Sequence, residues 1–472
     1  VRKGRRFWRG FRLGWIFGAV FFTATLWWIQ HVTLPGMLAL CAYLALYPAV
    51  FLGVVSWLGL RGEESWGGLS VRVLVPAGAW GGLEWVRTVA LSGFPWNGLG
   101  VPLFPSHGMR ALSSVTGVTG LSMIVVVVSV LVGMIWRLSG KSRRAAGVFL
   151  GVAVVLGTVA EVRCALDDAL ILSKPATDGK VVHVLLVQPN VTMAEKLSPD
   201  PEVQRKRYFD LVAQTDEALA RAAPKPDLVV WPESAVPGFF DEMVAGGAFK
   251  DQLAQGDITL VTGADHEEWG KLYNSVVAMR GTTENHVLHP KVRLVPFGEF
   301  IPFRKEIPIF ETMLGGLIPM DFSRGTSLDP ISLKGQNFSL APLVCFEDTI
   351  GEHARKFVRA EPQVLVNVTN DNWFLQSPAT EMHFANARWR APELHRTLVR
   401  SANTGVSAMV SPEGMVWRVP SFTEAAFQVP VSPGSGTITF YAAHGDLITQ
   451  VAGGLSLGGI GLILIRRRNR EN

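Results

Sequence analysis

The sequence has few charged residues and few cysteines for its length, and each shortage excludes a class of protein. The chain has 472 residues, of which 18% are charged and three are cysteines. Three cysteines cannot form a disulfide framework. No group of cysteines and histidines has the short ligand spacing of a structural zinc site. The sequence therefore predicts neither a disulfide-rich fold nor a bound metal, and it gives no indication of a cofactor.

The scarcity of charge is confined to part of the chain. The mean hydropathy of +0.26 averages two different compositions. Residues 13–166 have long apolar runs, whereas residues 174–445 have the composition of an ordinary globular domain. A last apolar run, 448–465, ends in a basic tail. We therefore predict three parts: N-terminal transmembrane helices in residues 1–170, a soluble catalytic domain in 171–445, and a closing transmembrane helix with a basic tail in 446–472.

The net charge of +5 could indicate nucleic-acid binding, but the positions of the basic residues argue against it. They cluster beside apolar runs, in residues 2–12, 137–144 and 466–470. Such clusters are typical of the cytoplasmic flanks of membrane spans. The pattern favours a membrane protein and predicts no nucleic-acid partner.

Six segments are long and apolar enough to cross a bilayer, which takes about 20 residues. They are residues 13–31, 36–58, 71–91, 115–136, 146–166 and 448–465. No small-residue cleavage site follows the first, so it is not a signal peptide. The positive-inside rule places all three basic clusters in the cytoplasm and residues 171–445 outside. We expect a multi-pass protein of the bacterial cytoplasmic (inner) membrane, with its catalytic domain on the periplasmic side.

The third predicted span is unusual because it contains Arg72, Glu84 and Arg87. Glu84 and Arg87 are three residues apart, so they share one face of a helix. Ionisable residues within the membrane are often functional. A structural ion pair near the outer interface is an equally good interpretation, and the sequence does not decide between the two.

Short apolar runs alternate with helix-compatible stretches in the globular part. Such runs, bounded by turn residues, are typical of buried strands. We predict strands over residues 180–187, 227–231, 258–263, 273–279, 288–299, 339–345, 364–368 and 406–410, with a helix around 381–399. This alternation favours a layered α/β fold whose sheets are covered by helices.

Three chemically useful side chains adjoin these strands: Glu233, Lys291 and Cys345. Taken singly, the cysteine would more often be a small core residue, and the two charged residues would be solvated at the surface. Together they form a plausible site, because a thiol becomes a nucleophile only with a base or a cation nearby. A carboxylate can take the thiol proton, and an ammonium group can stabilise an oxyanion.

The segments Trp231–Ser234 and Cys345–Glu347, with Lys291 between them, resemble the nitrilase or carbon–nitrogen hydrolase superfamily. That resemblance implies an αββα sandwich with a Glu–Lys–Cys triad. Four segments, together with the membrane spans on both sides of the domain, narrow the resemblance to its membrane-embedded branch, the apolipoprotein N-acyltransferase family. They are residues 93–96, 291–299, 370–374 and 400–405.

The resemblance implies a role for each matching residue. Glu233 would be the general base, Lys291 the partner of the thiolate and oxyanion, and Cys345 the nucleophile. The supporting residues would be Glu299, Phe346 and Glu347, and the residues of the substrate cleft would be Trp231, Asn370, Trp373, Phe374 and Trp96.

The implied reaction has two halves. Cys345 would take an acyl chain from the sn-1 ester of a phospholipid, such as phosphatidylethanolamine, to form a thioester. The N-terminal diacylglyceryl-cysteine of a lipoprotein would then accept the chain. The protein is expected to be a monomer. Two other hypotheses remain open, a membrane-tethered amidase or nitrilase and a non-catalytic scaffold that binds lipoproteins.

The sequence departs from the family pattern at three places. Relatives usually have seven spans before the soluble domain, and this sequence has five, which preserves the parity of the topology. Either the start was assigned late, or a GTG start codon was translated literally as Val1, or the first hairpin is absent. In addition, residues 192–197 have no tryptophan where relatives often carry one, and no glycine follows Phe374.

Overall fold

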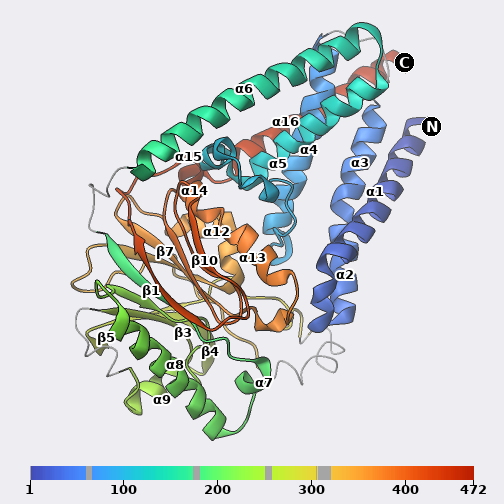
Figure 1. The fold of residues 1–472 in the computed structure, drawn as a ribbon. Helices are drawn as coiled ribbons and strands as arrows, with labels where there is room; N and C mark the ends of the chain where they lie inside the picture. Colours follow the sequence, from blue (N-terminus) through green and yellow to red (C-terminus); the bar gives the residue numbers. More distant parts are fainter. Residues whose placement is uncertain are drawn as a thin grey trace. The chain divides into compact units, whose positions relative to one another are not determined.

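The computed structural model of the chain (Figure 1) describes residues 2–59, 66–173, 181–249, 258–304, 306 and 320–471. The chain divides into two compact units. One consists of Val1–Lys174 and Ala443–Asn472, and the other of Pro175–Ala442. We refer to them as the helical unit and the sandwich unit.

The helical unit is built from seven α-helices among its described residues. They are α1 (Arg2–Leu26), α2 (Leu34–Leu44), α3 (Leu46–Leu58), α4 (Trp66–Val89), α5 (His107–Arg137), α6 (Gly140–Ser173) and α16 (Leu447–Glu471). In the described part of the chain, five helical stretches are long and apolar enough to cross a membrane: Gly4–His31, Leu34–Leu58, His107–Arg137, Gly140–Ile171 and Leu447–Ile465. These five coincide with five of the six predicted spans.

The sixth predicted span, residues 71–91, corresponds to α4. This helix is long enough to span, but it contains Arg72, Glu84 and Arg87 and is not one of the five apolar stretches. It ends at Val89, two residues before the predicted boundary, and the chain then enters a short turn in which Leu91 has a φ of 52°.

Close packing of α1 against α3 depends on small residues. Gly10, Gly14 and Gly18 recur every fourth residue and therefore lie on one face of α1. A Cβ atom on Gly14 would lie 2.3 Å from the carbonyl oxygen of Pro48 on α3. Small residues at this spacing let helices approach closely where water cannot drive their association.

The Glu84–Arg87 pair is buried within the helical unit, with 3% and 2% of the two residues exposed. Glu84 accepts hydrogen bonds from Trp80 Nε1 (2.7 Å) and from Ser122 Oγ on α5 (2.8 Å). Arg87 Nη2 lies 3.9 Å from Glu84 Oε1. Because the carboxylate links α4 to α5, these contacts favour the structural interpretation of the pair.

The sandwich unit contains two β-sheets (Figure 1). The first has the strand order β11-β1-β2-β3-β4-β5, and the second has the order β10-β9-β8-β7-β6. The strands are β1 (Val182–Gln188), β2 (Leu228–Val230), β3 (Thr259–Glu268), β4 (Lys271–Arg280), β5 (Thr282–Pro290), β6 (Ser339–Val344), β7 (Gln363–Thr369), β8 (Leu398–Ala402), β9 (Ser407–Val410), β10 (Val416–Val419) and β11 (Ala425–Val431).

Parallel pairing connects β1, β2 and β3 in the first sheet and β6, β7 and β8 in the second. The remaining neighbours pair antiparallel. Every residue of β2, β6, β7 and β8 is buried. Strands covered on both faces are expected to be continuously apolar, which is why the short apolar runs of β2, β6 and β7 could be recognised in the sequence.

Helices cover the outer faces of the two sheets, so the expected αββα sandwich is present (Figure 1). One apolar cluster lies between the sheets and includes Val184, Val344 and Val366. Another lies between the first sheet and its helices and includes Leu211 and Phe240. The helices of this unit are α7 (Met193–Lys196), α8 (Pro201–Arg221), α9 (Phe240–Ala245), α12 (Gly351–Ala354), α13 (Ala379–Ala387), α14 (Arg390–Leu394) and α15 (Phe440–His444), with short 3₁₀ turns η4 (Cys345–Thr349), η5 (Arg355–Phe357) and η6 (Asp371–Phe374).

The structure differs from the predicted secondary structure in three respects. The single helix predicted around residues 381–399 is two short helices, α13 and α14, followed by the start of β8. The strand predicted over residues 288–299 ends at Pro290 and continues as a loop. Strands β8, β10 and β11 were not predicted. Residue 180, where the first strand was predicted to begin, lies outside the described residues.

Candidate active site

Glu233 lies just beyond the end of β2, where the backbone turns sharply. Its neighbour Ser234 has a φ of 50°, a conformation that is uncommon for residues other than glycine. Strand β3 passes so close that a Cβ atom on Gly263 would lie 2.5 Å from the Cα atom of Glu233. The carboxylate is buried, and its Oε1 accepts a hydrogen bond of 2.7 Å from Asn274 Nδ2 on β4. The sharp turn, the close approach of β3 at Gly263 and the hydrogen bond from Asn274 together fix the position of the carboxylate.

Lys291 directly follows β5, and only 1% of it is exposed. Its Nζ donates a hydrogen bond to Glu299 Oε1 (2.9 Å) and lies 3.7 Å from Glu233 Oε1. Burial lowers the pKa of Lys291, but the two carboxylates outweigh this effect and hold the pKa above its ordinary value. Lys291 is therefore a permanent cation in the site.

Cys345 begins the turn η4 directly after β6, with a φ of 52°. Such backbone strain in a non-glycine residue is common at functional sites. The side-chain amide of Asn367 on β7 donates to the carbonyl oxygen of Cys345 at 2.9 Å. Burial raises the pKa of the thiol, Glu233 raises it further, and Lys291 lowers it in part. The resting thiol is therefore protonated, and attack requires a base.

The two sheets contribute different members of this group. Glu233 and Lys291 follow strands of the first sheet, whereas Cys345 follows a strand of the second. The structure thus brings together the three residues that the sequence singled out, close enough for the charges of Glu233 and Lys291 to act on the thiol.

Glu347, two residues after the cysteine, is completely buried. Its carboxylate accepts backbone hydrogen bonds from Val344 (2.8 Å), Val292 (2.9 Å) and Arg293 (2.7 Å). Burial raises the pKa of Glu347, but the nearby His353 and these N–H groups outweigh it and lower the pKa to about 2. Glu347 therefore ties the end of β6 to the segment that follows Lys291.

Glu299 and Phe346 both contact the lysine. Glu299 Oε1 accepts from Lys291 Nζ and from Asn274 Nδ2 (3.0 Å), while its Oε2 accepts from the backbone of Val295 (2.8 Å). The ammonium group of Lys291 lies 5.4 Å from the centre of the Phe346 ring, within the range of a cation–π interaction. Both side chains help to hold Lys291 in place.

Sequence reasoning missed Asn274, whose amide joins the carboxylates of Glu233 and Glu299. It also missed a buried network of charged side chains that reaches the turn η4, which begins at Cys345. His383 Nδ1 lies 2.6 Å from Asp371 Oδ1, and its Nε2 lies 3.0 Å from Asp348 Oδ1. Nothing in the sequence distinguishes His383 or Asn274 from ordinary polar residues.

Arg400 completes this network. Its Nε donates to Asp348 (3.1 Å) and its Nη2 to Asp371 (3.2 Å). Burial lowers the pKa of His383, but the two aspartates outweigh it and raise the pKa to about 9. Burial raises the pKa of Asp371, and His383 and Arg400 lower it to about 2. His383, Asp371 and Arg400 are therefore charged at neutral pH. Together with Asp348, they connect η4, η6, α13 and β8.

The residues predicted for the substrate cleft occupy different environments. Asn370 is buried and lines a pocket next to Glu233. Trp373 is 45% exposed and Phe374 is half-buried. The ring of Trp231 is fully buried in the core, where its Nε1 donates to Thr215 Oγ1 (2.9 Å). Of these four residues, the structure places Asn370 in the pocket lining and Trp231 in the core.

The fifth predicted cleft residue, Trp96, belongs to the helical unit. It is 4% exposed, and its ring centre lies 5.0 Å from that of Trp28 and 6.0 Å from that of Phe94. The ring is therefore part of an aromatic cluster in that unit, and its role in substrate binding stays a prediction.

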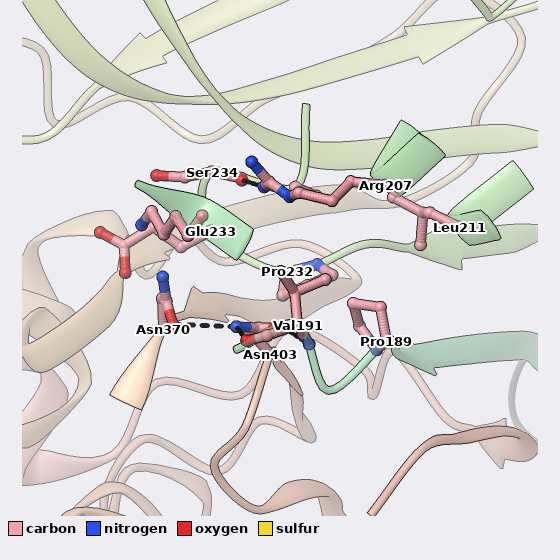
Figure 2. A pocket seen from close by; sticks show the side chains of 11 residues that line it. Pro189, Val191, Arg207, Leu211, Pro232, Glu233, Ser234, Asn370 and Asn403 are labelled. Atoms are coloured by element: carbon pink, nitrogen blue, oxygen red, sulfur yellow. Dashed lines mark hydrogen bonds between the residues drawn. The ribbon is translucent and has the colours of Figure 1, made fainter. Parts of the chain in front are cut away.

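A pocket opens next to Glu233 (Figure 2). Figure 2 shows Arg207 and Ser234 along one wall and Asn370 and Asn403 along the other, with Glu233 between them. The lining residues are Pro189, Val191, Lys196, Arg207, Leu211, Pro232, Glu233, Ser234, Ala235, Asn370 and Asn403.

In the described part of the chain, no three histidine, cysteine, aspartate or glutamate side chains are grouped as metal ligands.

This geometry suits acyl transfer through a covalent intermediate. A protonated thiol faces a buried carboxylate that can accept its proton. A fixed ammonium group beside both can stabilise the negative charge of a tetrahedral intermediate. Since Lys291 is held by Glu299, it provides charge without having to give up a proton.

Comparison with known families gives two matches. Residues 1–131 match the apolipoprotein N-acyltransferase N-terminal domain, and residues 190–431 match the carbon–nitrogen hydrolase domain. The second match covers the strands and turns that carry Glu233, Lys291 and Cys345.

Curated relatives match nearly the whole chain. An apolipoprotein N-acyltransferase from Geobacter metallireducens is 33% identical over 457 residues, which cover 93% of this chain and 84% of the relative. One from Rhizobium rhizogenes is 32% identical over 449 residues, 89% of this chain and 80% of the relative. Among solved structures, a carbon–nitrogen hydrolase superfamily protein from Xanthomonas campestris is 17% identical with a TM-score of 0.39, covering 54% of this chain and 91% of its own.

Proposed function

Because the chain belongs to the apolipoprotein N-acyltransferase family, we propose that it N-acylates lipoproteins through a thioester on Cys345. The observation that carries the proposal is the grouping of a buried carboxylate, a permanent cation and a protonated thiol at the ends of three strands. The donor is a glycerophospholipid such as phosphatidylethanolamine, and the acceptor is an N-terminal diacylglyceryl-cysteine.

In the first half-reaction, the Cys345 sulfur attacks the carbonyl carbon of the sn-1 ester while Glu233 takes the thiol proton. The carbonyl oxygen becomes an oxyanion, which the ammonium group of Lys291 stabilises. When the intermediate collapses, the ester C–O bond breaks and Glu233 returns the proton to the glycerol oxygen. The products are a thioester and a lysophospholipid.

In the second half-reaction, the uncharged α-amino group of the acceptor attacks the thioester carbonyl. Glu233 takes a proton from the amine, and Lys291 again stabilises the oxyanion. Collapse breaks the C–S bond, forms the amide and returns the proton to the Cys345 sulfur. The enzyme is thereby restored, and the same base serves both halves.

The proposal can be tested with the full-length protein in detergent micelles. Phosphatidylethanolamine alone should give a protein whose mass increases by one acyl chain on Cys345, and a diacylated lipopeptide should then remove the chain as an N-acyl product. A Cys345→Ala variant is the control. If the intact protein forms N-acyl peptide without a thioester on Cys345, the proposed mechanism is wrong.

The same proposal places the protein in the bacterial cytoplasmic membrane as a monomer, with the sandwich unit on the periplasmic side. Five apolar helices support membrane insertion. The orientation rests on the three basic clusters in the sequence and the positive-inside rule.

A further inference from the structure

The pocket next to Glu233 has a basic character that the proposed chemistry does not use. Two of its lining residues, Lys196 and Arg207, are cationic, whereas Glu233 is the one carboxylate that lines it. The triad already has its own cation in Lys291, which lies outside this lining. The presence of two further cations, Lys196 and Arg207, beside Glu233 therefore needs another explanation.

Lys196 is the last residue of α7, and the backbone of this short helix is firmly held. Thr192 and Glu195 form a reciprocal capping box at its start, with hydrogen bonds of 2.9 and 3.3 Å. Gln204 on α8 donates to the carbonyl oxygens of Lys196 (3.4 Å) and Ser198 (2.6 Å) at its end. The backbone position of Lys196 in the pocket wall is thus fixed by its neighbours.

The side chain of Lys196 has no hydrogen bond to the described residues and no carboxylate among them within 4.0 Å. Its charge acts at longer range on Glu233, Asp265 and Cys345. Burial lowers the pKa of Lys196, and Glu233 and Asp265 offset that effect only in part. A half-buried ammonium group next to the triad is therefore incompletely compensated.

Arg207 on α8 is 8% exposed, and only part of its guanidinium group is hydrogen-bonded to the described residues. Its Nη1 donates to Gln204 Oε1 and its Nη2 to the carbonyl oxygen of Ser234 at 3.4 Å (Figure 2). Its Nε is buried without a hydrogen-bond partner among the described residues. An unsatisfied buried donor of a charged group is costly, so an acceptor is expected to approach it.

We propose that Lys196 and Arg207 bind the phosphodiester of the phospholipid acyl donor while its sn-1 ester lies at Cys345. This inference rests on the proposed function. The phosphate is the one anionic group common to all glycerophospholipids, and it lies a few bonds from the sn-1 ester. The acceptor reacts through an uncharged α-amino group, which offers two cations no anion to bind. Guanidinium and ammonium groups are the usual protein ligands of phosphate.

The consequence is selectivity between donors. Diacylglycerol has the same sn-1 ester as phosphatidylethanolamine but no phosphate. Lys196 and Arg207 therefore favour the phospholipid, and loss of Lys196 should remove that preference without damaging the triad. Because a charge-assisted hydrogen bond is involved, the expected change in the ratio of the two rates is roughly tenfold to a hundredfold.

The test compares thioester formation by the full-length protein in neutral detergent micelles. We would measure kcat/KM for acylation of Cys345 by phosphatidylethanolamine and by diacylglycerol with identical chains. Lys196→Met should lower the value for phosphatidylethanolamine at least tenfold more than that for diacylglycerol, whose change reports only the long-range effect of the charge on Glu233 and Cys345, and Lys196→Arg should retain most of the preference. Lys206→Met is the matched control, because Lys206 lies on the exposed face of α8, paired with Asp210.

Competition distinguishes a lipid phosphodiester from a free phosphate ion. Glycerophosphoethanolamine should inhibit the wild type more strongly than inorganic phosphate at equal concentration, and Lys196→Met should abolish the difference. An unchanged donor ratio in Lys196→Met, an equal loss with both donors, or stronger inhibition by inorganic phosphate would overturn the proposal. Absence of any thioester in the wild type would instead contradict the proposed function.

Discussion

The protonation state of the Cys345 thiol determines what Glu233 and Lys291 have to contribute to the reaction. Burial and Glu233 raise the pKa of Cys345, although Lys291 lowers it in part. The resting site is thus a neutral thiol between an anion and a cation, and not a preformed thiolate. On the proposed mechanism, such a site keeps Cys345 unreactive until a substrate carbonyl is in place, and it makes Glu233 indispensable as the base.

We therefore expect Glu233→Gln to slow thioester formation by roughly 10²–10⁴-fold, the usual contribution of a general base. Gln keeps the shape and the hydrogen bond from Asn274 but cannot take the proton. The measurement is the rate of acyl-Cys345 formation by intact mass. Raising the pH should restore part of the lost rate, since hydroxide then competes for the thiol proton. A variant as fast as the wild type at neutral pH would show that another group is the base.

At the scale of the elements, the position of Glu233 depends on a strand to which it does not belong. A Cβ atom on Gly263 of β3 would lie 2.5 Å from the Cα atom of Glu233. Gly263→Ala should destabilise the protein by roughly 1–3 kcal/mol through overpacking. It should also lower the rate of thioester formation by up to about a hundredfold, because a shift of 1 Å at the site is enough for that.

Gly246→Ala at the end of α9 is the matched control for Gly263→Ala. Its nearest neighbouring atoms would be 3.4 Å from a new Cβ atom, and its φ is −73°. Thermal unfolding and the acylation rate should both stay close to wild type. Comparable losses in the two variants would mean that the close approach of β3 does not position Glu233.

The buried His383 network predicts how stability depends on pH. Because Asp371 and Asp348 raise the pKa of His383 to about 9, its stabilising contribution is complete below its ordinary pKa of about 6.5 and is lost as the pH rises through 9. The loss is on the order of 3 kcal/mol. The pKa of Asp371 is about 2, so its contribution is present above about 4 and lost as the pH falls toward 2.

Thermal unfolding of the full-length protein between pH 6.5 and 9.5 measures this effect. The wild type should lose stability across that range, and His383→Gln should be less stable at pH 6.5 but nearly independent of pH above it. An equally steep alkaline loss in both proteins would assign the dependence to other groups.

The elements also show what the sequence could and could not reveal. Strands buried on both faces, such as β2, β6 and β7, were predicted because continuous burial leaves a continuous apolar run. The polar residues at their ends, Glu233 and Cys345, could therefore be placed as well. Strands β10 and β11 are partly exposed, so they carry no such run and were missed.

Tertiary contacts explain the remaining misses. Strand β8 contains Arg400 and Ser401 in a fully buried position, which is possible because Asp348 and Asp371 pair with the arginine. From local pattern alone, the preceding helix was therefore predicted to extend to residue 399, into the start of β8. Asn274 gains its importance from two carboxylates that lie 41 and 25 residues away in the chain, a relationship that no local pattern encodes.

For the whole molecule, the decisive prediction concerns orientation. Trp269 is 92% exposed in the sandwich unit, and Lys141 is exposed at the start of α6, in a predicted cytoplasmic cluster. Single cysteines would be introduced by Trp269→Cys or Lys141→Cys after Cys41 and Cys164 are changed to Ala and Cys345 to Ser. A membrane-impermeant maleimide should label the first variant in intact spheroplasts and the second only after lysis. The reverse pattern would invert the topology.

The pairing of β1 with β11 has a consequence for the time at which the enzyme becomes active. These strands lie near opposite ends of the sandwich unit, in Val182–Gln188 and Ala425–Val431. During synthesis, Cys345 is therefore made well before the first sheet, which carries Glu233 and Lys291, can receive its edge strand. A nascent chain thus exposes a thiol that still lacks a finished base-bearing sheet, in surroundings rich in lipid esters. On the proposed mechanism, activation of Cys345 is thereby postponed until the chain is nearly complete.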